Sequence, residues 1–165
     1  MPVLRTQQNP ERKSLTLTAR FDAAPDRVWS VWADPRRLER WWGPPTYPAT
    51  FVDHDLTPGG RMAYYMTSPE GEKYHGWWRI LTVQRPSLIE FEDGFADGNG
   101  DPNPDLPVTI ARVTFTATDA GGTEMTIESV YPTIEAMEQV LAMGMEEGIT
   151  MAVNQIDALL AEAAA

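Results

Sequence analysis

The chain has 165 residues, of which 42% are hydrophobic and 22% are charged, and it contains no cysteine. This length and balance are typical of one globular domain with its own core, and the lack of cysteine excludes disulfides and thiolate metal sites. The net charge of −11 at pH 7 repels a phosphate backbone, so no nucleic acid is expected as a partner.

The first predicted strand is Ser14–Phe21, because apolar and polar side chains alternate along it. The residues before it, 1–13, are polar, and we expect a flexible tail there. Pro25 suits the first turn of a helix. The pair Asp34-Pro35 ends that helix and begins a second short one, which runs to about Trp41.

The middle of the chain consists of short apolar stretches separated by turn signals such as Pro58-Gly59-Gly60. Their close spacing predicts an antiparallel meander without crossover helices. The segment Gly94–Pro107 is rich in glycine, proline and aspartate, and we expect a long loop there; the sequence does not tell whether this loop gates a cavity. The predicted strands are Ala49–Leu56, Arg61–Thr67, Lys73–Gln84, Leu88–Asp93, Thr109–Thr118 and Glu124–Tyr131.

The last predicted element is one long amphipathic helix from Ile134 to about Ala163, with Thr133 as its N-cap. Gly144 and Gly148 fall near the centre of its apolar face, where each costs roughly 1 kcal/mol relative to alanine. Either they leave space open, or they allow an aromatic ring to approach closely.

These elements predict an α+β fold of the helix-grip type over residues 14–163, as a single domain. A curved antiparallel sheet of about seven strands wraps around the long C-terminal helix, because only that arrangement buries both apolar faces. The two short helices lie between strands 1 and 2.

Motifs for common catalytic sites are missing. The chain has no phosphate-binding glycine loop and no nucleophile elbow, so we expect no cofactor. On a strand, His54 points away from the face shared by Asp53 and Asp55, so these residues cannot grip one metal ion together, and no metal site is expected. His75 occupies either an ordinary strand position or a cavity wall, where it would serve as an acid or base.

Aromatic and methionine side chains recur on the inward faces of the predicted strands. Core packing accounts for many of them. Methionines and hydroxyl-bearing aromatics opposite the two helix glycines instead indicate an adaptable apolar pocket with a few polar groups. The candidate ligand-binding residues are Trp42, Tyr64, Met66, Trp78, Phe91, Met145 and Ile149.

Ordered segments between Ser14 and Leu160 carry a family resemblance. They are Val28-Trp29 with Asp34-Pro35, Leu38 with Trp41-Trp42-Gly43-Pro44, Asp55-Leu56-Thr57-Pro58-Gly59-Gly60-Arg61, His75-Gly76-Trp77-Trp78-Arg79-Ile80, Gly121-Gly122-Thr123-Glu124-Met125-Thr126, and Gly144-Met145-Glu146-Glu147-Gly148. Together they resemble the activator-of-Hsp90-ATPase homologue family (AHSA1-like), within the START/Bet v 1-like (SRPBCC) superfamily. The resemblance implies the helix-grip fold and a pocket.

Three positions depart from that family. Ile80 replaces an acidic residue common in relatives, Ile149 replaces an aromatic residue, and Gly94–Pro107 is longer than usual. The loss of the acidic side chain removes a group that would orient a ligand or transfer a proton. For this reason the resemblance does not identify a substrate.

Three functions follow as hypotheses. The first is a hydrophobic-ligand-binding or stress-related protein. The second is a cavity-based enzyme of the polyketide cyclase or hydratase type, with His75, Tyr64 and Asp93 as acid/base candidates. The third is an Hsp90-type co-chaperone, although no separate chaperone-binding module is present. The resemblance also leaves a homodimer open.

The sequence predicts a cytoplasmic location. No apolar run approaches the roughly 18–20 residues of a membrane span. The polar start, Met1 to Ser14, lacks the apolar centre of a secretory signal.

Overall fold

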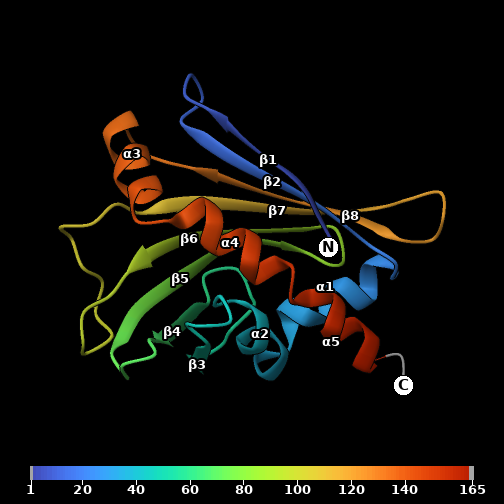
Figure 1. Ribbon diagram of the computed structural model, residues 1–165, viewed down its shortest axis with the longest axis horizontal. Helices are drawn as coiled ribbons and strands as arrows, with labels where there is room; N and C mark the ends of the chain where they lie inside the picture. Colours follow the sequence, from blue (N-terminus) through green and yellow to red (C-terminus); the bar gives the residue numbers. More distant parts are fainter. Residues whose placement is uncertain (1, 164–165) are drawn as a thin grey trace.

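The computed structural model describes residues 2–163, which form one antiparallel sheet and a set of helices (Figure 1). Three observed strands, Ser14–Phe21, Arg61–Thr67 and Lys73–Gln84, have the bounds that were predicted from the sequence. The elements are β1 Val3–Asn9, β2 Ser14–Phe21, α1 Pro25–Ala33, α2 Pro35–Trp41, β3 Ala49–Asp53, β4 Arg61–Thr67, β5 Lys73–Gln84, β6 Leu88–Phe95, β7 Thr109–Ala117, β8 Thr123–Val130, α3 Ile134–Ala142, α4 Met145–Val153 and α5 Ile156–Ala163.

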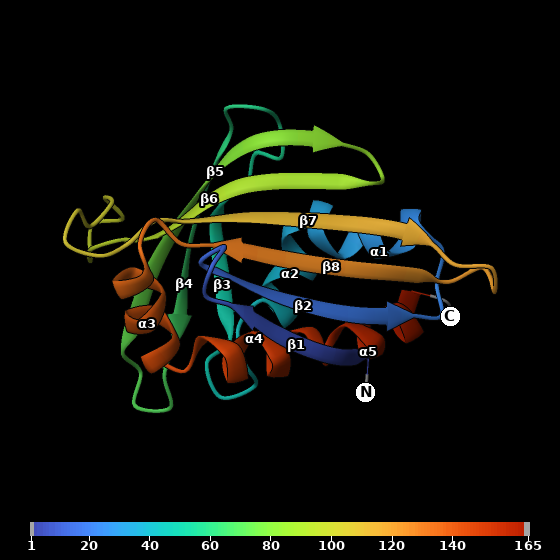
Figure 2. The ribbon, with the colours of Figure 1, turned by 90° about the horizontal axis from the view of Figure 1, so that it is seen from above.

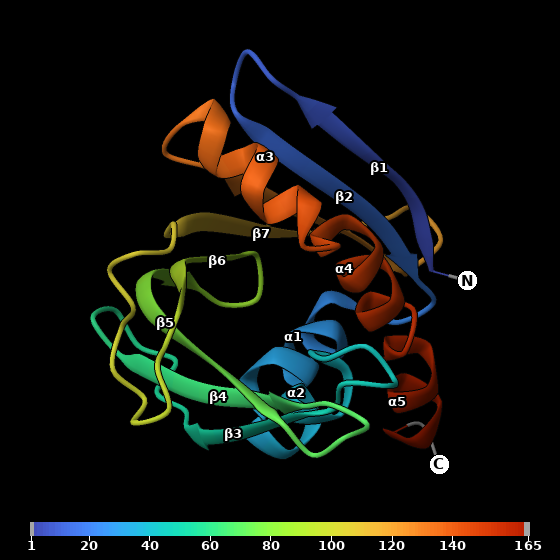
Figure 3. The same cartoon turned by 60° about the vertical axis from the view of Figure 1, so that its left-hand side comes forward.

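The sheet has eight strands in the order β1-β2-β8-β7-β6-β5-β4-β3, and every neighbouring pair is antiparallel. It curves strongly, so that β1 and β2 lie at one end of an open arc and β3 and β4 at the other, with α4 beside the opening (Figure 3). The α+β class and the antiparallel sheet were therefore predicted correctly. The strand number was not, and α1 and α2 lie between β2 and β3 rather than between strands 1 and 2.

The extra strand lies where the sequence predicted a flexible tail. Residues of β1 pair with β2, from Val3 opposite Ala19 to Asn9 opposite Ser14. Most side chains of β1 are exposed. Backbone hydrogen bonds hold this strand in place, and they leave no trace in the apolar pattern that was used to find strands, so the prediction of a tail was wrong.

The predicted long C-terminal helix is divided into α3, α4 and α5 (Figure 2). The first break is at Gly144, whose φ of 86° is the left-handed conformation that favours glycine. At the second break, Asn154 Oδ1 accepts a hydrogen bond from the Val3 amide at 3.1 Å, and Gln155 Nε2 donates to the Gly43 carbonyl at 2.7 Å. These side chains tie the break to the start of the chain and to the loop after α2.

The core fills the half of the arc next to α1, α2 and α5. α1 buries Val28, Trp29, Val31 and Trp32 and contacts both β7 and α5. Asp34 caps α2 by accepting a hydrogen bond from the Arg36 amide. The buried Trp41 indole donates to the Val31 carbonyl at 2.9 Å, which fixes α2 against α1. The other half of the arc, beneath α3 and the start of α4, contains the pocket described below.

The loop predicted over Gly94–Pro107 begins later than expected. β6 continues through Gly94 to Phe95, and Ala96 forms an isolated bridge with Pro102.

Among the described helices, none is both long and apolar enough to cross a bilayer.

Candidate functional site

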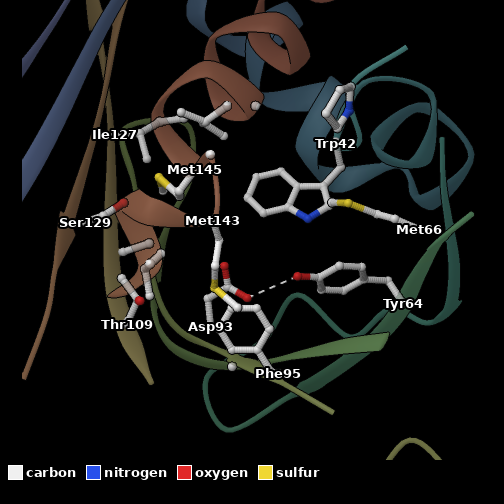
Figure 4. Close-up of a pocket in the computed structure, with 17 residues that line it drawn as sticks. Trp42, Tyr64, Met66, Asp93, Phe95, Thr109, Ile127, Ser129, Met143 and Met145 are labelled. Carbon is white, nitrogen blue, oxygen red and sulfur yellow. Dashed lines mark hydrogen bonds between the residues drawn. The ribbon is translucent and has the colours of Figure 1, made fainter. Parts of the chain in front are cut away.

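A pocket of about 300 Å³ opens between the concave face of the sheet and the junction of α3 and α4 (Figure 4). Strands β4, β6, β7 and β8 supply one wall. The helices supply another, and Trp42 and Pro44 close the side next to α2. Most of the lining is apolar, and a few polar side chains interrupt it, which is the composition typical of small-molecule sites.

The two glycines of the C-terminal helices border this space. A Cβ atom added at Gly144 would have no other atom within 4 Å, and one added at Gly148 would meet only Pro44 Cγ, at 3.9 Å. The sequence left two explanations open for these glycines. The geometry favours open space, since no aromatic ring packs against either of them.

The Tyr64 ring lies flat over its neighbour on β5, because that neighbour is a glycine and has no side chain to displace the ring. Tyr64 pairs with Gly76 in the register of β4 and β5. A Cβ atom at Gly76 would lie 2.4 Å from the tyrosine ring. Phe51 stacks on the other side, with ring centroids 5.1 Å apart. The hydroxyl is thereby held toward Asp93 on β6, to whose Oδ1 it donates a hydrogen bond of 3.2 Å (Figure 4).

Asp93 is a carboxyl group in apolar surroundings. It lies opposite Trp78 on β5 and Thr109 on β7. Burial raises the pKa of Asp93 from 3.8 to about 7, and the hydrogen bond from Tyr64 offsets part of that rise. Burial also raises the pKa of Tyr64 well above 10, and the nearby Asp93 raises it further. At neutral pH, Asp93 therefore exchanges a proton readily, whereas Tyr64 keeps its own.

Indole groups add unused hydrogen-bond donors beside this pair. Trp42 is 8% exposed, and its ring centroid lies 4.7 Å from that of Trp78 and 6.3 Å from that of Tyr64. Neither the Trp42 nor the Trp78 Nε1 atom has a hydrogen-bond partner within the described part of the chain. Trp78 lies close enough to Asp93 to lower its pKa slightly, although its geometry does not make a hydrogen bond. Trp42 lines the pocket, although its Nε1 atom is itself buried.

The structure brings five of the seven candidate ligand-binding residues to the pocket wall: Trp42, Tyr64, Met66, Met145 and Ile149. The other two, Trp78 and Phe91, point to the same side of the sheet but lie deeper. Their rings stack on each other at 4.1 Å, and both are almost completely buried. They form the floor of the core and are absent from the pocket lining.

Of the three acid/base candidates, Tyr64 and Asp93 meet in the pocket, and His75 does not. His75 lies opposite Tyr65, with ring centroids 5.6 Å apart. Side chains alternate across β5, so His75 is on the face opposite to Gly76 and Trp78. It is therefore on the convex side of the sheet.

Several pocket residues were missed by the sequence reasoning. Thr109 and Ser129 are polar yet 8% and 3% exposed, on the inward faces of β7 and β8. The available signal was strand parity, because Thr109 lies two residues from the buried Ala111 and Ser129 two residues from the buried Ile127, on the same face of each strand. Other lining residues lie in loops and at helix ends, where parity gives no guidance. They include Pro44, Phe95 and Met143.

A comparison with protein families matches residues 22–161 to the family described as "Activator of Hsp90 ATPase homolog 1-like protein". This chain belongs to that family. The AHSA1-like match covers most of the domain, from the end of β2 to α5. A search of the curated proteins found no match.

Solved structures show the same fold as this AHSA1-like protein. Protein Ms6760 from Mycobacterium smegmatis is 52% identical, with a TM-score of 0.89 and coverage of 96% of this chain and 97% of that one. A protein from Arthrobacter aurescens is 49% identical, with a TM-score of 0.93 and coverage of 97% and 92%. An AHSA1 protein from Silicibacter pomeroyi, 22% identical over 90% of this chain and 97% of its own, shares the fold with a TM-score of 0.71.

Proposed function

We propose that this AHSA1-like protein binds a small, largely apolar molecule in the pocket under α3 and α4. The observation that carries the proposal is the space itself, about 300 Å³ beside Gly144 and Gly148. Small-molecule pockets typically have volumes of about 300–1,000 Å³, so this space lies at the lower end of that range and suits a small ligand.

The walls suit a ligand that is apolar with a polar end. Met66, Met143 and Met145 adapt their shape to a bound molecule, and Ile127 and Ile149 supply further apolar surface. The hydroxyls of Thr109 and Ser129 and the carboxyl of Asp93 orient a polar group. Apolar burial would supply most of the affinity, and these groups the specificity.

The test is to fill the pocket with a side chain. Gly148→Leu places an isobutyl group into the space that the ligand would occupy. Gly98→Leu is the matched control, since a Cβ atom there has no atom within 4 Å and Gly98 does not line the pocket. Phenylbutanol is the probe, and its binding is measured by the shift in melting temperature and by the intrinsic tryptophan fluorescence.

We expect wild type and Gly98→Leu to bind phenylbutanol and Gly148→Leu to lose binding. Equal binding by all three proteins would mean that the probe sits elsewhere. The proposal is rejected if wild type does not bind phenylbutanol and native mass spectrometry of the purified protein detects no bound small molecule.

One observation favours a second candidate, a cavity-based enzyme of the cyclase or hydratase type. The pKa of about 7 at Asp93 and its hydrogen bond with Tyr64 suit a group that takes a proton from a carbon beside a carbonyl and returns it to the oxygen formed. Asp93→Asn would then abolish turnover of a bound keto substrate while leaving its binding intact. Unchanged turnover in that variant would exclude this candidate.

A further inference from the structure

The pocket contains one charged side chain among the described residues that line it, Asp93. Its Oδ1 accepts the hydrogen bond from Tyr64, and no hydrogen bond among residues 2–163 involves its other carboxylate oxygen. None of the ion pairs in the same part of the chain includes Asp93. A carboxylate in an apolar wall is costly without a partner of opposite charge, so this pocket favours a ligand that brings one.

Aromatic rings surround the same carboxyl. Trp42, Tyr64 and Phe95 all line the pocket, and Figure 4 shows Phe95 beside Asp93, Tyr64 facing it and Trp42 farther from it. The faces of aromatic rings carry partial negative charge and attract cations, most strongly for tryptophan. The combination of one carboxylate with several rings is suited to an ammonium group.

The charge of the whole molecule acts in the same direction. The net charge of −11 at pH 7 attracts cations over long distances and repels carboxylates and phosphates. No lysine, arginine or histidine lines the pocket among the described residues, so an anionic head group would find no partner there.

Resting on the proposed function, we propose that the ligand is a small apolar molecule that carries a basic nitrogen. Its ammonium group binds the Asp93 carboxylate beside the rings of Trp42 and Tyr64, and its apolar body lies against the methionines under α3 and α4. The Trp42 ring then contributes its face to the cation.

This binding depends on pH in a defined direction. Four groups face Asp93 or lie close to it from other strands: Tyr64 on β4, Trp78 on β5, Thr109 on β7 and Tyr131 at the end of β8. Burial raises the pKa of both tyrosines, so they stay neutral. An alkyl ammonium stays charged up to a pH of about 10. Only Asp93 changes charge near pH 7, and affinity for the amine rises as it ionises.

Three probes of matched shape test the inference: phenylbutylamine, phenylbutanol and phenylbutyrate. Their dissociation constants are measured by calorimetry at pH 6 and pH 8 with wild type and with Asp93→Asn, whose folding is checked by circular dichroism. At pH 8 we expect wild type to bind the amine about tenfold more tightly than the alcohol, and the acid most weakly. The preference for the amine over the alcohol should shrink at pH 6, and it should be lost in Asp93→Asn.

The outcomes separate the two proposals. If the alcohol binds and the amine shows no preference at pH 8, the ammonium inference is wrong and the apolar pocket stands. Tighter binding of phenylbutyrate than of phenylbutylamine would overturn the inference in the same way. If none of the three probes binds, the pocket proposal fails and the inference fails with it. The wild-type comparison across pH decides the matter even if Asp93→Asn does not fold.

Discussion

Replacing the two pocket glycines with alanine should change the stability of the protein in opposite directions. Neither substitution meets a steric obstacle, because an added Cβ atom contacts nothing at Gly144 and only Pro44 Cγ, at 3.9 Å, at Gly148. Only the backbone distinguishes them. Gly148 lies inside α4, whereas Gly144 has a φ of 86° at its N-cap. The pair therefore separates backbone conformation from packing.

The magnitudes follow from that difference. Alanine at Gly148 gains roughly 0.8 kcal/mol from its better helix propensity. At Gly144 the left-handed conformation costs alanine roughly 1–2 kcal/mol, and the less flexible unfolded chain returns roughly 0.4–1 kcal/mol. The net loss is then about 0.8 kcal/mol, and the two variants differ by about 1.6 kcal/mol. For a domain of this size that is about 3–6 °C in Tm.

Urea unfolding and thermal melts of both variants beside wild type provide the assay, and an unchanged m-value is needed to compare the free energies. If both variants shift in the same direction, the assignment of a left-handed Gly144 and a helical Gly148 is wrong. A loss of stability in Gly148→Ala alone would mean that the space beside α4 is filled.

Further predictions concern the buried carboxyl, the core and the edge of the sheet. Because burial raises the pKa of Asp93 to about 7 from 3.8, the folded protein retains a proton that the unfolded chain releases, and this contribution to stability is lost as pH rises from about 4 to 7. Asp93→Asn should therefore gain stability relative to wild type between pH 5 and pH 8 in urea unfolding, and a constant difference would contradict this. Phe91→Ala should cost about 3–5 kcal/mol, because this ring is fully buried and stacked on Trp78, whereas Ile110→Ala on the exposed face of β7 should change stability by less than about 0.5 kcal/mol; similar losses in the two variants would refute the assignment of core and surface. Removal of residues 1–9 should expose the edge of β2 and produce species larger than the full chain forms in gel filtration as concentration increases, and an identical elution profile would argue against a structural role for β1.

The strands could be predicted because turn signals and side-chain alternation agree in this chain. β2, β4 and β5 have the bounds that their sequences indicated. β1 could not be found in this way, since five of its seven side chains are exposed and, apart from the packing of Val3 against the core, it is held by backbone hydrogen bonds and polar groups. Thr6 and Gln8 donate hydrogen bonds to Glu146, a contact between the two ends of the chain that no local pattern contains.

The C-terminal region shows the limit of helical periodicity. The apolar stripe continues through the breaks, so the sequence suggests one helix where there are three. Met151 belongs to that stripe and yet is 47% exposed, whereas Val153 is completely buried. The break after α4 depends on hydrogen bonds of Asn154 and Gln155 with distant backbone atoms. A turn made by tertiary contacts cannot be predicted from periodicity.

The sequence predicted on which face of the sheet the site residues lie, but not which of them reach the pocket. Strand parity placed Trp78 and Tyr64 on the inward face, and both point there. Parity does not say how far a ring extends along the arc, so it could not separate the core floor, where Trp78 and Phe91 stack, from the pocket wall. The importance of Asp93 follows from the apolar groups around it, which only the folded sheet brings together.

The pairing of β2 with β8 also determines when the domain can form during synthesis. Phe21 aligns with Thr123, and Ser14 with Val130, so these two neighbouring strands are synthesised early and late. Until β8 leaves the ribosome, β2 has no partner on one side, and the apolar concave face stays open to solvent. Because contacts between distant segments form slowly, the pairing of β2 with β8 is expected to be a late step in folding.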